Sequence, residues 1–161
     1  MKTYVMIPTY NERENIENLI GEILNLKISD LHVVVVDDNS PDGTSEIVKS
    51  LAKEHAEVEL LLRTTGRGRG SAGIAGFKYA LEHGADCVVE MDADFSHHPK
   101  YIPSFLEAIQ GADMVIGSRA VAGGKDVNRG IARRVITFLA GVYVKMLLGL
   151  RIKDVSSGYR C

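Results

Sequence analysis

The stretch Leu31–Asp38, LHVVVVDD, constrains the fold more than any other part of the sequence. A continuous run of β-branched residues is typical of a strand that is buried on both faces, and such strands occur mainly in parallel sheets covered by helices. The run ends in two carboxylates, Asp37 and Asp38, and the turn sequence NSPDGT, Asn39–Thr44, follows at once. The stretch therefore predicts a central strand of an α/β sheet with acidic side chains at its carboxyl end.

Strand and helix patterns alternate along the first 119 residues. Further apolar strands are expected at Thr3–Pro8, Val58–Arg63, Cys87–Asp92 and Asp113–Arg119. Helical spacing of apolar residues follows Asn11, a candidate N-cap, and is expected again from Thr44 or Ser45, over Ile74–His83 and over Pro99–Gln110. Repeated strand–helix units predict one α/β domain with a mostly parallel central sheet and helices on both faces.

The composition fits a single soluble domain. The chain has 161 residues, of which 45% are hydrophobic and 25% charged. No apolar run reaches the ~18 residues of a transmembrane helix, and Met1-Lys2 leads directly into a strand pattern, without a signal peptide. The two cysteines, Cys87 and Cys161, are too few for a disulfide framework. We therefore expect a buried thiol at Cys87 and a reducing, cytoplasmic compartment.

The charge is distributed unevenly along the chain. Residues 1–118 contain 10 Lys+Arg against 19 Asp+Glu, a balance of −9, whereas residues 119–161 contain 9 against 2, a balance of +7. A basic segment beside an acidic body indicates contact with an anion, either a phosphate or a membrane surface. A solvated helix face explains the same charges equally well. The segment includes the long, apolar, helix-like stretch Ile131–Leu150.

Polar motifs follow the carboxyl ends of four expected strands. They are PTYNE (Pro8–Glu12), DDNSPDGT (Asp37–Thr44), DADFSHH (Asp92–His98) and GSR (Gly117–Arg119). In an open parallel sheet the ligand binds beyond the carboxyl ends of the strands. We therefore expect these motifs to line one rim of the sheet.

Asp92 and Asp94 are the candidate metal ligands. Residues i and i+2 of an extended chain point to the same side, so the two carboxylates can converge on one cation. Hard oxygen ligands suit Mg²⁺ or Mn²⁺, which leave other coordination positions to water and substrate phosphate. The alternative is a capped turn before the next helix, with Asp94 or Ser96 as the N-cap. Zinc at His97-His98 is disfavoured because no cysteine or third histidine lies at ligand spacing, which leaves loop contacts or helix capping.

The other rim motifs offer contacts for a nucleotide. Of Asp37 and Asp38, one can face the cleft and accept hydrogen bonds from ribose hydroxyls or a base N–H, while the other orients the turn. Tyr10 and Glu12 can clamp a nucleobase and its ribose, although an acidic first helical turn also explains Glu12. Arginine binds phosphate oxygens bidentately. The candidate anion contacts are Arg119, Arg133 and Arg134, and we expect at least one of the last two to be solvated.

The stretch Gly68–Gly73 supports an alternative of another class, a dinucleotide-binding oxidoreductase domain that takes NAD. It matches G-x-G-x-x-G between a strand and a helix, with acidic residues roughly twenty positions further on. The fingerprint normally opens its unit, whereas this match follows the third strand, and Arg67 and Arg69 crowd the loop. The loop can instead hold one of those arginines near a phosphate, or let helix and sheet pack closely.

Six motifs resemble, in order and spacing, those of the polyprenyl-phosphate sugar synthases, with the dolichyl-phosphate mannose synthases nearest. They are MIPTYNERENI, VVDDNSPDGT, GSAGIAGFKYAL, MDADFSHHP, GSR and VSSGYRC. The resemblance covers nearly the whole chain. It implies the GT-A fold and transfer of mannose, with inversion, from GDP-mannose to dolichyl phosphate. Glucose or another hexose from a UDP-sugar stays open, because the base-contacting residues do not separate guanine from uracil.

The resemblance also implies roles for individual residues. Asp92 and Asp94 would bind the metal and the donor diphosphate with Ala93 beside them. Ser96, where relatives often carry glutamine, would reach the metal through water. The nucleotide would be held by Pro8, Tyr10, Glu12, Val36 and Asp38. The donor diphosphate or acceptor phosphate would meet Arg119 and Arg133 or Arg134, so that the catalytic set is Asp94, Arg119 and Arg133.

A phosphate acceptor agrees with the few acids in the last part of the chain. A hydroxyl acceptor needs a general base, whereas a phosphomonoester, with a second pKa of about 6, is already ionised near neutral pH. Asp126 and Asp154 are the only acids after residue 118, and neither is an obvious base.

The resemblance divides the chain into a nucleotide-sugar-binding core, 1–119, and an acceptor-side segment, 120–161, of the same domain. Ile131–Leu150 would lie on the cytoplasmic face of the membrane, with a core helix as the alternative. Relatives run on after SGYR, so we expect the C-terminus to be truncated. Nucleic acid is not an expected partner.

Overall fold

The computed structural model describes residues 1–118, 131–149, 154 and 157–161. Strands and helices alternate in the first part of the chain, as predicted. The elements are β1 (Thr3–Thr9), α1 (Ile16–Leu24), β2 (Leu31–Asp37), α2 (Thr44–Glu54), β3 (Val58–Leu62), α3 (Arg69–Glu82), β4 (Cys87–Glu90), α4 (Ile102–Ala108) and α5 (Ile131–Leu148). Short 3-10 turns flank α4 at Pro99–Tyr101 and Ile109–Gly111.

Four parallel strands form the sheet in the order β3-β2-β1-β4. Thr3 of β1 lies opposite both Leu31 of β2 and Cys87 of β4. The valines 33–36 of β2 have no exposed surface, as expected of a central strand between two helical layers. The predicted α/β class with a parallel central sheet is confirmed.

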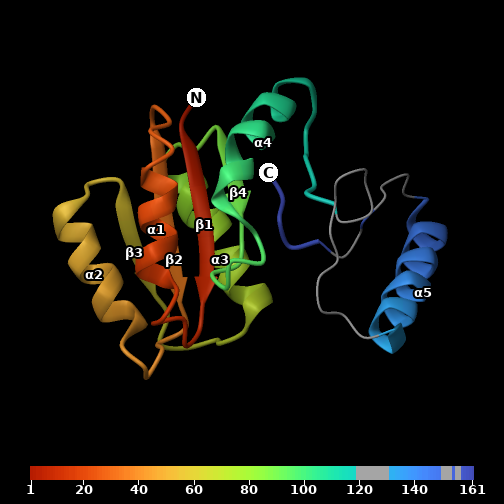
Figure 1. Cartoon of the computed structure of the whole chain (residues 1–161), viewed down its shortest axis with the longest axis horizontal. Coiled ribbons are helices and arrows are strands. Elements are labelled where there is room, and N and C mark those ends of the chain that lie inside the picture. The colour runs from red at the N-terminus through yellow and green to blue at the C-terminus, as the bar shows by residue number, and fades with distance from the viewer. Residues whose placement is uncertain (119–130, 150–153, 155–156) are drawn as a thin grey trace.

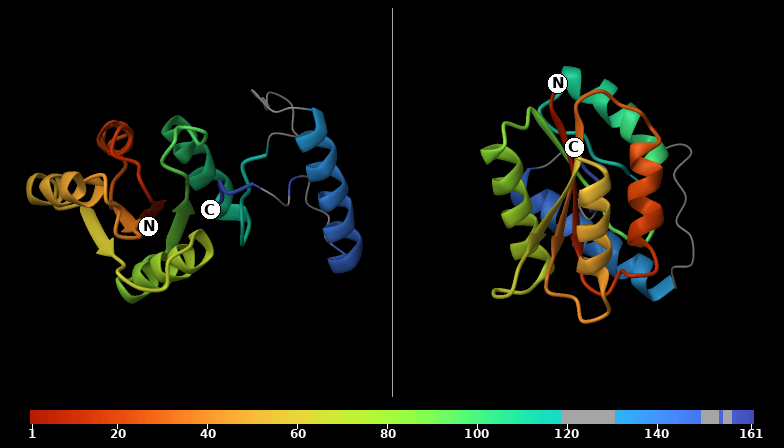
Figure 2. Two further views of the ribbon diagram at one scale, coloured as in Figure 1. Left: turned by 90° about the horizontal axis from the view of Figure 1, so that it is seen from below. Right: turned by 90° about the vertical axis from the view of Figure 1, so that its left-hand side faces the viewer.

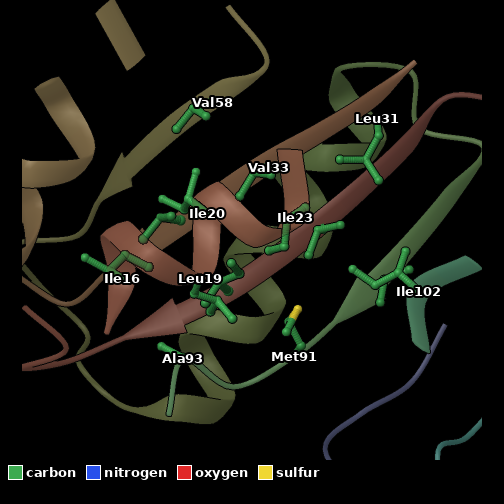
Figure 3. Packing of buried hydrophobic residues seen from close by; sticks show 14 of the residues in the cluster. Ile16, Leu19, Ile20, Ile23, Leu31, Val33, Val58, Met91, Ala93 and Ile102 are labelled. Carbon is green, nitrogen blue, oxygen red and sulfur yellow. The ribbon is translucent and has the colours of Figure 1, made fainter. Parts of the chain in front are cut away.

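Helices cover both faces of the sheet, as Figures 1 and 2 show. On one face, apolar residues of α1 pack on alternate residues of β1 and β2 (Figure 3); these are Ile16, Leu19, Ile20 and Ile23 against Val5, Ile7, Val33 and Val35. On the other face α3 packs on the intervening residues, which include Met6, Val34 and Val36. Burial of each such side chain stabilises the fold by ~1.5–3 kcal/mol, so the two clusters fix the sheet and the loops at its rim.

Two helices begin at positions other than the expected ones. Asn11 is not a helix N-cap, because it has a φ of 60° and its N–H donates to Ser40 Oγ, and α1 begins at Ile16. α3 begins at Arg69 rather than at Ile74. Gly68 turns the chain there with a φ of 132°, and the carboxylate of Asp38 accepts its N–H. Most of the glycine-rich stretch is therefore helical.

The described part of the expected fifth strand, residues 113–118, is not a strand of the sheet. Val115 and Gly117 instead exchange backbone hydrogen bonds with residues 159–161. Arg160 pairs in antiparallel fashion with both Ile116 and Glu90 of β4, so the chain's last residues lie where the fifth strand was expected to pair. The buried free thiol expected at Cys87 is confirmed.

α5 presents an exposed apolar face and lies apart from the sheet in Figures 1 and 2. Ile136, Leu139, Tyr143 and Met146 recur at helical spacing and are 60–76% exposed. Within the described ranges, no helix combines the length and hydropathy that crossing a bilayer requires.

Candidate functional site

A cleft of about 230 Å³ opens at the carboxyl ends of β1, β2 and β4. Its position follows from the strand order: β2 and β3 extend the sheet on one side of β1, and β4 is added on the other side. Ligands of open parallel sheets bind at such a switch point, where the order of strand addition changes side. The lining residues come from three of the predicted rim motifs and from the start of α3. They are Pro8, Thr9, Tyr10, Glu12, Asp38, Arg69, Ala72, Asp92, Ala93 and Asp94.

Asp37 and Asp38 differ in position, as the sequence predicted: one orients the turn and the other faces the cleft. Asp37 is fully buried and orients the turn, because it accepts hydrogen bonds from the Thr9 hydroxyl and from both the N–H and the hydroxyl of Ser40. Asp38 lines the cleft. Its carboxylate already has partners, Arg63 Nη1 at 2.5 Å and the Gly68 N–H at 2.7 Å, and it thereby ties the start of α3 to β2.

The residues after β1 form one wall of the cleft. Pro8, Tyr10 and Glu12 line it, and the Tyr10 side chain is exposed, with the Arg67 guanidinium 5.9 Å from its ring centre. Glu12 accepts a hydrogen bond from the Asn15 side chain at 2.9 Å, next to the start of α1. Val36 is a fully buried core residue that packs in the α3 cluster.

The opposite wall is the turn after β4, which carries Asp92, Ala93 and Asp94. Asp94 Oδ1 accepts the Ser96 N–H at 3.0 Å, and Phe95 between them has a φ of 59°, so the chain reverses sharply here. Although partial burial opposes the shift, the hydrogen bonds from Ser96 keep the pKa of Asp94 below its ordinary value. Asp94 is therefore ionised at neutral pH, as a metal ligand must be. Ser96 itself is exposed.

This donor set fits a magnesium or manganese ion that is completed by a substrate. Asp92 and Asp94 both reach the cleft, but the described residues contain no group of three or more His, Cys, Asp or Glu that could hold a metal on their own. Mg²⁺ commonly binds through one or two carboxylates plus substrate phosphates and water. Two carboxylates at the mouth of an open cleft suit that arrangement.

Arg69 and Glu90 lie next to the turn that carries Asp92, Ala93 and Asp94. The Arg69 guanidinium donates a hydrogen bond to Asp92 Oδ1, and its other terminal nitrogen lies 3.6 Å from Glu90 Oε1. Glu90, the last residue of β4, is buried and also lies 3.3 Å from Arg160 Nε. Burial raises the pKa of Glu90, and the two arginines act against that shift.

The sequence alone did not place the chain's last residues at this site. Tyr159 is buried, stacks on the His97 ring at a centroid distance of 4.9 Å and donates its hydroxyl to the His98 carbonyl. His97 Nδ1 in turn accepts the Asp92 N–H at 2.9 Å. The only sequence signal for this contact was the resemblance of SGYRC itself, because nothing in its pattern indicates a partner 61 positions away.

The two histidines have structural contacts of the kind predicted in place of zinc. His98 is the N-cap of the 3-10 turn at Pro99 and accepts the Lys100 N–H. Of the expected phosphate contacts, Arg119 lies outside the described residues. Arg133 and Arg134 lie in the first turn of α5, and their side chains are outside the described part of the structure.

Comparison with known proteins gives relatives over nearly the whole chain. The undecaprenyl-phosphate mannosyltransferase of Micrococcus luteus is 46% identical over 160 residues, which cover 99% of this chain and 65% of that protein. The polyprenol monophosphomannose synthase of Mycolicibacterium smegmatis is 43% identical over 161 residues, or 99% of this chain and 60% of that protein. The chain therefore spans less than two thirds of the length of either relative.

A solved structure supports the fold. Glucosyl-3-phosphoglycerate synthase from Mycobacterium tuberculosis, in complex with Mn²⁺, UDP and glucosyl-3-phosphoglycerate, has a TM-score of 0.62 at 19% identity and covers 99% of this chain and 55% of that one. The GT-A-like α/β architecture expected from the resemblance is thus confirmed. The family described as Glycosyl transferase family 2 matches residues 4–160, and the chain belongs to this family.

Proposed function

We propose that this chain carries the donor site of a mannosyltransferase that transfers mannose from GDP-mannose to a polyprenyl phosphate with inversion. The observation that carries the proposal is the pair Asp92 and Asp94 at the mouth of the switch-point cleft. The relatives named above, a polyprenol monophosphomannose synthase and an undecaprenyl-phosphate mannosyltransferase, support the choice of substrates.

Asp92 and Asp94 would hold Mg²⁺ or Mn²⁺, with Ala93 beside them and Ser96 acting through water. When bound, the ion would neutralise the charge that develops on the departing diphosphate. The nucleotide would lie against the other wall, on Pro8, Tyr10, Glu12 and Asp38, with Val36 beneath it. The cleft supports this assignment because these residues, apart from Val36 and Ser96, line it together.

The reaction needs no proton transfer to activate the acceptor. An oxygen of the ionised phosphomonoester forms the new bond to C1 of mannose, and the C1–oxygen bond to the diphosphate breaks, with its electron pair leaving on GDP. Arg119 and either Arg133 or Arg134 would position the two phosphates, since arginine binds phosphate oxygens in pairs. Asp94, Arg119 and Arg133 are the proposed catalytic residues.

The chain would bind its polyprenyl phosphate acceptor at a membrane surface. In this proposal residues 1–119 bind the donor, and residues 120–161 face the acceptor on the cytoplasmic side. The support is the exposed apolar face of α5, which lies in the segment with a charge balance of +7. A helix of this kind lies in the interface with its apolar face towards lipid and its basic groups towards anionic headgroups.

Calorimetry tests the donor site. We expect GDP-mannose to bind in the presence of Mn²⁺ and to bind at least tenfold more weakly without it, since the ion bridges carboxylate and diphosphate. UDP-glucose and NADH, titrated in parallel, distinguish a UDP-sugar transferase and a dinucleotide-binding domain. Transfer of labelled mannose to a short polyprenyl phosphate tests the reaction itself.

Asp94→Ala is the critical variant. It should abolish Mn²⁺-dependent GDP-mannose binding while the circular dichroism spectrum stays unchanged. Asp113→Ala removes a carboxylate at an exposed position outside the cleft and serves as the matched control. Unchanged GDP-mannose affinity in Asp94→Ala would remove the metal from the proposal.

A further inference from the structure

Arg69 is the one basic side chain among the described residues that line the cleft. The same lining contains four carboxylates, those of Glu12, Asp38, Asp92 and Asp94. Asp38 is paired with Arg63, whose charge is therefore already engaged. A diphosphate that enters this cleft meets mainly negative side chains, so it needs positive charge from the protein as well as from a cation.

The guanidinium of Arg69 is held in place from three sides. One terminal nitrogen contacts Asp92 Oδ1, and the other lies 3.6 Å from Glu90 Oε1. Gly158 closes the third side, because a Cβ at that position would lie 2.8 Å from Arg69 Nη2. The chain therefore packs its C-terminal residues directly against this arginine.

The contact with Asp92 places Arg69 in competition with a divalent cation. Asp92 Oδ1 accepts a hydrogen bond from Arg69, so a cation that binds this oxygen has to replace the guanidinium. The Arg69 and Asp92 side chains are 50% and 32% exposed. An ion pair this accessible to water is weak, so a doubly charged ion can displace the guanidinium.

Glu90 keeps the displaced side chain at the cleft. Its carboxylate is buried and lies at the end of β4, and it stays close to the second terminal nitrogen of Arg69. Once Asp92 is no longer its partner, Arg69 has N–H donors available at the place where the cleft lacks positive charge. Arginine presents paired donors that match phosphate oxygens.

We infer that Arg69 changes partner during donor binding, from the Asp92 carboxylate to the donor diphosphate once Asp92 binds the cation. The inference rests on the proposed function. It adds to that function a diphosphate-binding residue and a contact that holds the metal site closed in the absence of a cation.

Arg69→Gln separates the two halves of this exchange, because it should shift two affinities in opposite directions. Without nucleotide, calorimetry should show Mn²⁺ binding about 3- to 10-fold tighter, since the ion no longer competes with a cation for Asp92. With saturating Mn²⁺, GDP should bind about tenfold more weakly because a charge-assisted contact is lost, while GMP changes by less than about twofold.

Two further variants complete the test. Arg69→Lys keeps the charge and should leave Mn²⁺ affinity near that of the unchanged protein, with GDP affinity between the two. Lys78→Gln removes one positive charge from an exposed position of the same helix and should shift neither affinity. Thermal melts of all variants confirm that each is folded.

The inference is overturned if Arg69→Gln leaves Mn²⁺ affinity unchanged or weakens it, or if GDP and GMP weaken to the same degree. Either result would give Arg69 a structural role only. The unchanged protein supplies the separate test of the proposed function, because Mn²⁺-dependent GDP binding must be present there before any variant is compared. Its absence would contradict the proposed function itself.

Discussion

Asp37 is a buried carboxylate whose hydrogen bonds contribute to the stability of the folded protein. It has no exposed surface and accepts from the Thr9 hydroxyl and from Ser40 twice. Asp37→Asn puts an NH₂ group among three donors, and an unsatisfied buried polar group is costly. We expect it to lower the free energy of unfolding by about 2–4 kcal/mol, measured by urea denaturation.

Asp42→Asn is the matched control, because Asp42 also accepts three hydrogen bonds, from Thr44 twice and from the Arg13 N–H, but is only partly buried. A loss of about 1 kcal/mol or less is expected there, since water replaces the lost partners. Equal losses in the two variants would show that burial does not decide the cost.

The same residues show where prediction from sequence ended. The strand pattern indicated that two carboxylates follow β2, but it left open which one faces the cleft. The answer depends on Ser40, which donates to Asp37, and on Arg63, which donates to Asp38. Arg69 was named only as one of two arginines that a phosphate could meet, because its contact with Asp92 joins residues that are 23 positions apart.

α3 packs closely on the sheet at Gly76, so a side chain at this position should weaken the packing of the helix. A Cβ at Gly76 would lie 2.5 Å from Met6 Cγ and 2.9 Å from Val36 Cγ2, and both of these side chains are fully buried. Gly76→Ala should therefore lower the free energy of unfolding by about 1–3 kcal/mol, despite the better helix propensity of alanine. Thermal and urea denaturation measure it.

Gly21 provides the opposite case in α1, since a Cβ at that position would meet no atom within 4 Å. Gly21→Ala should raise the free energy of unfolding by up to about 1 kcal/mol, the helix propensity gain alone. If both glycine variants stabilise the protein, α3 is not seated as closely on the sheet as the structure shows.

Elements were predicted well where one periodicity dominates and poorly where tertiary contacts decide. The β2 valines and the apolar spacing of α1 are local signals, and both elements formed. The start of α3 depends on the hydrogen bond from Gly68 to Asp38, which lies 30 residues away. Likewise, Val115 and Gly117 pair with the SGYRC segment, a contact that no local pattern in residues 113–118 predicts.

At the scale of the whole molecule, an acidic sheet domain adjoins a basic segment that contains an apolar helix. The charge balance of −9 over residues 1–118 disfavours binding of that part to an anionic membrane, so the contact would have to come through the segment of +7. The chain should therefore bind vesicles that contain anionic phospholipid more tightly than neutral ones. Binding should weaken as salt rises, because screening shortens the range of the attraction.

The apolar face of α5 should contribute independently of that charge. Leu139 and Met146 lie two turns apart on it and are 60% and 76% exposed. Replacing both with glutamine should weaken vesicle binding by about tenfold or more, since each buried methylene contributes ~0.8 kcal/mol. Leu81→Gln changes a residue on α3 that is 68% exposed and should leave binding unchanged. If Leu81→Gln weakens vesicle binding as much as the double variant does, the α5 face has no specific role in lipid binding. If the unchanged chain self-associates in place of binding vesicles, the α5 face has a partner other than lipid.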